Sequence, residues 1–262
     1  MSKPVESILE MLGLEEKEAP LVVPSRGLIE EGGKLYGHFF DGPAGIFRRT
    51  PVKQSKKNGY WYRDDTFDRD SVKQCLENYA AIKCAGEVVL DFGANVGGFS
   101  RMAVEQGAKQ VVSIEPCPFN FDMLEKNSPG SLNLNAAVTG DGSTEVDFTY
   151  TISKRNSVSS STVQRMNSSD VGIKVKALDF KALLDKYQPG VLKVDIEGAE
   201  YGILDSIEKI PDCVKVSAFE FHRGAEPYAS YPDRFFPPSE WIAVEHPGGR
   251  FASLRDIVFT RR

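Results

Sequence analysis

The stretch from Val88 to Ser100, VVLDFGANVGGFS, constrains the fold more than any other part of the chain. Apolar residues and the carboxylate of Asp91 precede a glycine-rich turn, and Phe99, Met102 and Ala103 follow at the spacing of a buried helix face. This pattern predicts a strand, a loop and a helix. Glycine in such a loop lets the backbone approach a ligand, and the first turn of the helix offers N–H groups without backbone partners. We therefore expect a ligand-binding turn at the end of a strand in an α/β sheet.

The spacing of the glycines separates two classes of ligand. A dinucleotide fingerprint, Gly-x-Gly-x-x-Gly, has glycine where this chain has Asn95, so the pyrophosphate cradle is incomplete. The pattern Asp91-x-Gly93-x-x-x-Gly97 favours the amino-acid end of S-adenosylmethionine, which carries a cation and a carboxylate instead of a diphosphate. A nicotinamide-dependent oxidoreductase and a non-catalytic binding module of the same architecture are the alternatives.

A second acid follows the next predicted strand. Val111 to Ile114 is apolar enough for a buried strand, and Glu115 comes directly after it. In a nucleoside-binding sheet, an acid at this strand end accepts hydrogen bonds from both ribose hydroxyls. Glu115 is therefore the predicted ribose ligand, and the alternative for it is a solvated carboxylate without a ligand.

Composition limits the remaining possibilities. A chain of 262 residues with 41% hydrophobic residues can bury one large core. We expect an N-terminal arm with a small hairpin over residues 1–67 and one α/β domain over residues 68–262. The net charge of −5 disfavours a broad nucleic-acid surface, and four cysteines without C-x-x-C spacing favour reduced, partly buried thiols. Residues 1–20 are too charged for a signal-peptide core, and no apolar run is long enough for a bilayer, so we expect a cytoplasmic protein without a membrane span.

Local patterns outline the N-terminal part. Residues 1–20 predict a short amphipathic helix, and the turn at Asp41-Gly42 predicts a hairpin. The aromatic run Tyr60-Trp61-Tyr62 either packs in the core or lies on the rim of a pocket. Asp68 begins a helix with one apolar face.

The second half of the chain predicts further strands. Leu132 to Val138 is expected to pair through the turn at Asp141-Gly142 with the strand over residues 146–150. Asp179 is expected to begin a helix, and residues 241–245 and 254–260 are expected to form a final hairpin.

Two segments match the chemistry of an acceptor site. The serine-rich residues 153–170 are too polar for a core, so they are either disordered or a lid over a site. The segment after His222 is rich in aromatic side chains, which stack on sugar rings. We expect both to close over the cofactor, with Arg155, Asn156, Tyr228, Tyr231, Phe235 and Phe236 as the contact residues.

Acids gather at two other predicted strand ends. Asp195 and Glu197 follow the strand over residues 191–194, and Glu220 and His222 end the strand that begins at Val214. A carboxylate or an imidazole at such a strand end can accept a proton from a bound hydroxyl group as a general base. His222 and Asp195 are equal candidates for this base, and a purely structural role for both stays open. The carboxylates also suit a divalent cation, so the metal is left unknown.

Four motifs in this order resemble the FkbM-type S-adenosylmethionine-dependent methyltransferases over roughly residues 68–220. They are LDFGANVGGFS, SIEPCPFNFDML, LNAAVTGDGSTEVDF and LKVDIEGAEYGIL. The resemblance implies a seven-strand Rossmann-like methyltransferase sheet with an antiparallel last strand and helices on both faces. It also implies methyl transfer to an oxygen, often a sugar hydroxyl.

The resemblance also assigns residues. It implies that Asp91, Gly93, Asn95 and Gly97 hold the methionine part, that Glu115 holds the ribose, and that Asp195 and Glu197 face the methyl group. Asn120 and Ala136, in the second and third motifs, complete the expected cofactor site, and His222 joins the expected catalytic set.

The expected activity is O-methylation by S-adenosylmethionine, with a sugar in a glycan or a glycosylated metabolite as the favoured acceptor. The alternatives are a non-sugar small molecule, a peptide, or a nucleotide-binding Rossmann oxidoreductase. No nucleic-acid partner is expected, and the oligomeric state is left open.

Overall fold

The computed structural model describes residues 27–41, 46–150, 160–161, 171–222, 230–246 and 254–262. The amphipathic helix expected over residues 1–20 lies outside these ranges. Among the helices in these ranges, none is both long and apolar enough to cross a membrane.

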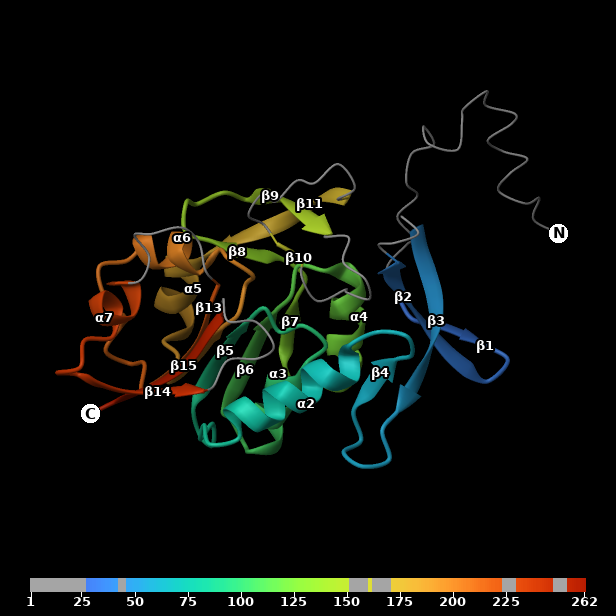
Figure 1. The fold of residues 1–262 in the computed structure, drawn as a ribbon, viewed down its shortest axis with the longest axis horizontal. Helices are drawn as coiled ribbons and strands as arrows, with labels where there is room; N and C mark the ends of the chain where they lie inside the picture. Colours follow the sequence, from blue (N-terminus) through green and yellow to red (C-terminus); the bar gives the residue numbers. More distant parts are fainter. Residues whose placement is uncertain (1–26, 42–45, 151–159, 162–170, 223–229, 247–253) are drawn as a thin grey trace, which may run out of the picture.

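A seven-stranded sheet forms the centre of the molecule (Figure 1). Its strands, in spatial order, are β14 (Trp241–His246), β15 (Leu254–Arg261), β13 (Val216–His222), β12 (Val191–Val194), β5 (Val88–Phe92), β6 (Gln110–Ile114) and β7 (Leu132–Leu134). The five strands from β13 to β7 run parallel, whereas β15 is antiparallel to both β13 and β14. This topology confirms the Rossmann-like methyltransferase sheet with an antiparallel last strand and the final hairpin.

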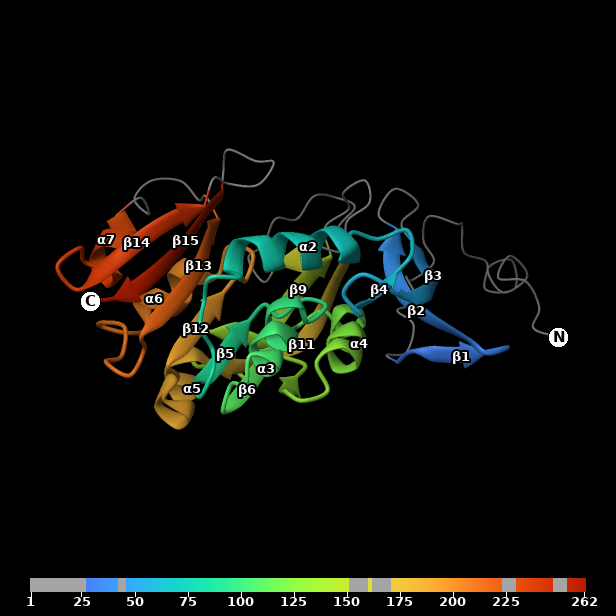
Figure 2. The ribbon, with the colours of Figure 1, turned by 90° about the horizontal axis from the view of Figure 1, so that it is seen from below.

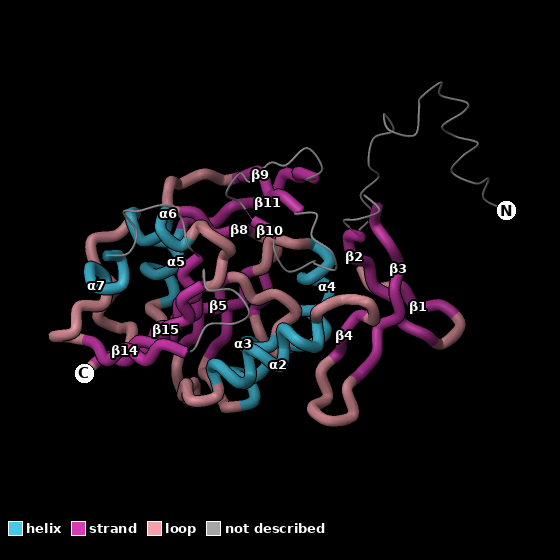
Figure 3. Tube along the Cα trace, viewed as in Figure 1, coloured by secondary structure: helices cyan, strands magenta, loops and turns pink. Residues whose placement is uncertain are grey.

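Helices cover both faces of this sheet (Figures 2 and 3). They are α2 (Asp68–Tyr79), α3 (Gly98–Glu105), α4 (Pro118–Asn127), α5 (Phe180–Tyr187), α6 (Glu200–Asp205) and α7 (Tyr231–Phe235). Val89 and Val191 pack with Tyr79 of α2 and Phe99 of α3 on one face. Leu90, on the opposite face, belongs to a cluster with residues of α5, α6 and α7. This alternation along β5 places Asp91 on the side of α2 and α3.

The helix start expected at Asp179 is confirmed, because its side chain accepts a hydrogen bond from Ala182 N at 2.8 Å.

A second sheet departs from the sequence-based expectation. Its order is β10 (Ser160–Ser161), β9 (Glu145–Tyr150), β11 (Val171–Asp179) and β8 (Ala137–Thr139). The strand expected over residues 132–138 is therefore two strands, β7 and β8, in different sheets. The turn at Asp141-Gly142 does not join a hairpin, since β11 lies between β8 and β9. A local turn pattern cannot show that a later strand inserts between two neighbours.

The N-terminal hairpin belongs to a larger antiparallel sheet. The sheet contains β1 (Ile29–Glu31), β2 (Lys34–Asp41), β3 (Ile46–Gln54) and β4 (Trp61–Arg63), in that order. The pairing of β2 with β3 confirms the expected hairpin. Tyr60 and Tyr62 are buried, so they pack in the core, whereas Trp61 is half-buried and lines a pocket. Figure 1 shows this sheet beside α4, at the end of the molecule opposite β14.

Two polar residues join the N-terminal sheet to the main domain. The guanidinium of Arg63 forms two hydrogen bonds with the carboxylate of Asp68, at 2.8 and 2.9 Å, and donates to Asn120 Oδ1 at 2.7 Å. Asn127, at the end of α4, pairs with both backbone groups of Trp61 and donates to Val96 O at 2.7 Å. Asn127 therefore links β4 directly to the loop after β5.

The aromatic segment after His222 packs differently from what the sequence predicted. Tyr231, Phe235 and Phe236 are buried in the main core, and Phe236 stacks on Phe259 with ring centroids 3.9 Å apart. Burial in the core removes these three rings from an acceptor site. Tyr228 and nearly all of the expected lid, except Ser160 and Ser161 of β10, lie outside the described residues.

Candidate active site

The glycine loop passes very close to the corner after β12. Gly93 has a φ of +74°, and a Cβ atom there would lie 1.7 Å from the backbone oxygen of Asp195. The N–H groups of Gly93 and Ala94 both donate to Ile114 O at 3.0 Å, so the start of the loop is tied to β6. Asn95 and Gly97 also have positive φ angles, of 50° and 87°. Glycine at position 93 is required by both the backbone angle and the space.

Asp91 lies beneath this loop with no exposed surface. One carboxylate oxygen accepts a hydrogen bond from Ser100 Oγ at 2.5 Å, and the other lies 3.4 Å from Lys193 Nζ. Burial alone would lower the pKa of the Lys193 ammonium, but the charges of Asp91 and Asp195 hold that pKa above its usual value. The structure therefore places Asp91 behind the loop, where it fixes neighbouring groups.

Glu115 connects the loop to the start of α4. Its two carboxylate oxygens accept hydrogen bonds from Asn95 N and Cys117 N, both at 2.8 Å. The residue is only 5% exposed. Burial raises the pKa of Glu115 to about 7, although the two backbone hydrogen bonds act in the opposite direction.

The other two expected cofactor residues lie near this region but are buried. Asn120 uses its side-chain oxygen for Arg63, and Ala136 packs in the main core.

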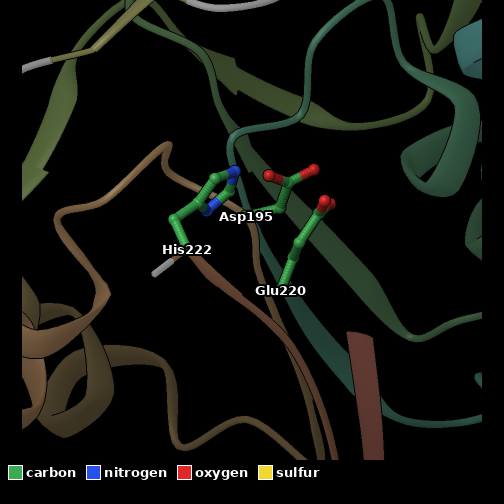
Figure 4. A group of neighbouring side chains, drawn as sticks. All are labelled: Asp195, Glu220 and His222. Carbon is green, nitrogen blue, oxygen red and sulfur yellow. The ribbon is translucent and has the colours of Figure 1, made fainter. Parts of the chain in front are cut away.

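Acids from two strand ends meet beside the loop. The polar ends of Asp195, Glu220 and His222 point toward one another (Figure 4), and one ligand atom from each lies within 4.8 Å of the others. The side chain of Asp195 is 28% exposed and that of Glu197 is 27% exposed. The charge of Asp195, together with burial, raises the pKa of Glu220 to about 9. Asp195 and His222, two of the expected catalytic residues, therefore lie together with Glu220.

His222 has carboxylates on both sides of its ring. Nε2 lies 3.2 Å from Glu197 Oε2, and Nδ1 lies 3.0 Å from Glu200 Oε1. Burial alone would lower the pKa of His222, but hydrogen bonds to these two carboxylates raise it to about 12. Glu200 is fully buried and also accepts from Ile196 N and Gly198 N, at 3.1 Å each, so it anchors the corner itself.

Sequence reasoning missed three residues of this site, namely Ser100, Lys193 and Glu200. One signal was present, because Lys193 interrupts an otherwise apolar strand, and parallel strands buried on both faces are usually continuous hydrophobic runs. Ser100 and Glu200 showed no such signal, since polar residues are common near the first turn of a helix.

Comparisons with known proteins agree with this geometry. Residues 91–233, more than half of the chain, match the model of the methyltransferase FkbM domain. The match begins at Asp91 and includes the loop, Glu115 and the acidic corner. No curated protein matches the chain in sequence.

Several solved structures match this chain at low identity. A putative transferase from Pyrococcus horikoshii is 13% identical, with 98% of this chain and 80% of that chain covered and a TM-score of 0.45. A putative methyltransferase from Escherichia coli is 14% identical, with 90% and 98% covered and a TM-score of 0.39. A precorrin-6y C5,15-methyltransferase from Geobacter metallireducens is 10% identical, with 79% and 92% covered and a TM-score of 0.41.

Proposed function

Because the chain belongs to the FkbM methyltransferase family, we propose that it transfers the methyl group of S-adenosylmethionine to a hydroxyl oxygen. The proposal of a hydroxyl acceptor rests on two half-buried carboxylates, those of Asp195 and Glu197, beside the glycine loop. A hydroxyl loses a proton during the transfer, and a carboxylate accepts it. The favoured acceptor is a sugar in a glycan or a glycosylated metabolite, on the strength of the family resemblance. A non-sugar small molecule or a peptide is the alternative.

We propose that the loop after β5 binds the methionine part of the cofactor. Gly93 and Gly97 keep the backbone free of side chains there, Asn95 completes the turn, and Asp91 supports the loop from below. Glu115 would accept the ribose hydroxyls in addition to its two backbone donors, since each carboxylate oxygen has two lone pairs. Asn120 and Ala136 would shape the adenosine side from within.

The bound cofactor supplies an activated methyl group, so the protein mainly aligns the acceptor and excludes water. We propose Asp195 as the group that accepts the proton. Both ring nitrogens of His222 already contact carboxylates, so this geometry favours a role for His222 in holding Glu197 in place. Direct proton removal by His222 is the competing proposal.

A divalent cation is another way to use the same side chains. Asp195, Glu220 and His222 offer two carboxylates and an imidazole, a set that suits Mn²⁺ better than Mg²⁺, which prefers oxygen ligands. Methyl transfer measured after EDTA treatment and after addition of Mn²⁺ or Mg²⁺ tests this use. An unchanged rate would exclude a required cation.

The proposed reaction is tested by measuring S-adenosylhomocysteine release with a panel of free sugars, glycosides, non-sugar alcohols, amines and peptides. Release with sugars alone is expected. Release only with amines would contradict a hydroxyl acceptor. Release with non-sugar alcohols would contradict the proposal that the acceptor is a sugar. The cytoplasmic location stays a prediction from the sequence.

A further inference from the structure

A lysine stands in the middle of the main sheet. Lys193 is the third residue of β12, which is paired with β5 on one side and β13 on the other, and it is only 4% exposed. Taking an ammonium out of water carries a large free-energy penalty unless charges and hydrogen-bond acceptors surround it. The residues around its Nζ atom therefore explain why a cation is tolerated at this place.

Two carboxylates and the carbonyls of Phe92 and Gly93 surround the ammonium. Nζ lies 3.4 Å from Asp91 Oδ1 and 3.6 Å from Asp195 Oδ2, and it donates a hydrogen bond to Gly93 O at 2.7 Å. Lys193 and Asp91 are direct neighbours across the β12–β5 pair. The ammonium thus balances two acids at adjacent strand ends while it binds the backbone of the loop.

The hydrogen bond to Gly93 extends the sheet beyond the end of β5. The last regular bond there joins Asp195 N to Phe92 O at 3.0 Å. After Phe92 the chain turns away, and the N–H of Gly93 is taken by Ile114 O on the other side. In the next peptide, the Gly93 carbonyl accepts from Lys193 Nζ and the Ala94 N–H donates to Ile114 O at 3.0 Å, so the Gly93–Ala94 peptide is held from β12 and from β6 at once.

We propose that Lys193 is a positioning residue of the cofactor site, which holds the Gly93 peptide and the Asp195 carboxylate in the arrangement that binds S-adenosylmethionine. This inference rests on the proposed role of the loop in cofactor binding. Lys193 acts through Gly93 and Asp195, and Asp91 serves as the buried counter-charge that keeps the ammonium in place.

The test removes the two opposite charges together. An effect of Lys193 on the arrangement of the loop can then be distinguished from an effect on the stability of the fold. Lys193→Met leaves Asp91 buried without its cation, so that variant alone is expected to be strongly destabilised. Asp91→Asn combined with Lys193→Met removes both charges with side chains of similar size, which is tolerated much better. Asp91→Asn alone keeps the ammonium and is the matched reference. Lys215→Met, which removes an exposed lysine paired with Glu87, is the unrelated control.

Affinity for S-adenosylhomocysteine and for S-adenosylmethionine is measured by calorimetry, with the melting temperature of each variant. Exchange of amide hydrogens in a peptide over residues 92–98 reports the loop directly. We expect the double variant to have nearly the same melting temperature as Asp91→Asn. It should bind both ligands about tenfold or more weakly than that variant, and the amide hydrogens of its loop should exchange faster. Lys215→Met should match wild type.

Equal affinity and equal loop exchange in the double variant and in Asp91→Asn would overturn the role of Lys193. A double variant that loses affinity only in proportion to a large fall in melting temperature would also overturn it, because the role would then be structural. Absence of binding by the wild-type protein would instead contradict the proposed function, so the two failures are distinguishable.

Discussion

At the scale of single residues, position 93 has the strictest requirement in the site. We expect Gly93→Ala to lower the affinity for S-adenosylhomocysteine by about tenfold or more, because a Cβ atom 1.7 Å from Asp195 O forces the loop away from the corner. Calorimetry with the purified variant measures this effect.

Gly86→Ala is the matched control for that change. Gly86 has a φ of +76°, nearly the same as Gly93, but a Cβ atom there meets nothing within 4 Å. Both variants carry the strain of a left-handed backbone, about 1–2 kcal/mol, and only one carries the clash. Equal affinities in the two variants would contradict the close approach.

The second residue-scale prediction concerns pH. Burial raises the pKa of Glu115 to about 7, while Cys117 N, Asn95 N and the charge of Lys193 lower it and the charge of Asp195 raises it further. The proposed hydrogen bonds from the ribose hydroxyls are stronger to the ionised carboxylate. Affinity for S-adenosylhomocysteine should therefore rise by about tenfold from pH 6 to pH 8, as the protonated fraction disappears.

Glu115→Gln should abolish this pH dependence and weaken binding at pH 8 by about 1.5–3 kcal/mol, the range for a hydrogen bond to a charged group. Without ligand, the contribution of Glu115 to the stability of the fold changes with pH in the opposite direction. A carboxyl with a raised pKa stabilises the fold below its unfolded value of 4.5, and this stabilisation is lost as the pH rises through about 7. A wild-type affinity that is flat between pH 6 and pH 8 would return Glu115 to a structural role.

At the scale of elements, the joint between β4 and α2 depends on one buried ion pair. Arg63 and Asp68 are both nearly inaccessible, and their two hydrogen bonds close the turn between the strand and the helix. We expect Asp68→Ala to lower the free energy of unfolding by about 3–5 kcal/mol, because it leaves the guanidinium buried without its counter-charge. Urea denaturation followed by circular dichroism measures the change.

Replacing both partners provides the control for that prediction. Arg63→Met with Asp68→Leu removes both charges, so it should recover most of the stability lost in the single variant. A double variant as unstable as Asp68→Ala would show that packing, and not the unpaired charge, is responsible.

At the scale of the whole molecule, the N-terminal sheet and the methyltransferase domain share buried contacts. Phe47 of β3 packs on Phe119 of α4 with ring centroids 5.2 Å apart, in a cluster that also contains Phe148 of β9. The N-terminal sheet and the second sheet therefore meet at the start of α4. The described N-terminal sheet, β1 to β4, is bound to the rest of the protein by these contacts and by Arg63.

A fragment of residues 68–262 tests this union. It lacks Arg63 and Phe47, so Asp68 and Asn120 lose their partner and Phe119 becomes more exposed. We expect its free energy of unfolding to be at least about 3 kcal/mol below that of the full chain, measured by urea denaturation. A fragment with the same midpoint and the same cofactor affinity would show that the extension is an independent unit.

Much of the site could be read from the sequence because its elements are local. The strand, the glycine loop and the helix over residues 88–105 are adjacent in the chain, and their periodicities differ in a visible way. The same holds for the acids that directly follow β6 and β12. Parallel strands bring their carboxyl ends to one edge, so the meeting of Asp195 with Glu220 and His222 was also predictable.

Only the tertiary structure decided which side chains face the cofactor loop and which face the core. Lys193 binds the carbonyl of Gly93, a residue 100 positions earlier, and Phe236 stacks on Phe259 instead of lining an acceptor site. Likewise, β11 lies between β8 and β9, so the hairpin that the local pattern favoured does not form. The physical reason is common to all three, because the direction of a side chain and the partner of a strand depend on pairing and packing between segments far apart in the chain. The residues alone determined the βα units and the class of cofactor, and strand order then determined how those units share one site.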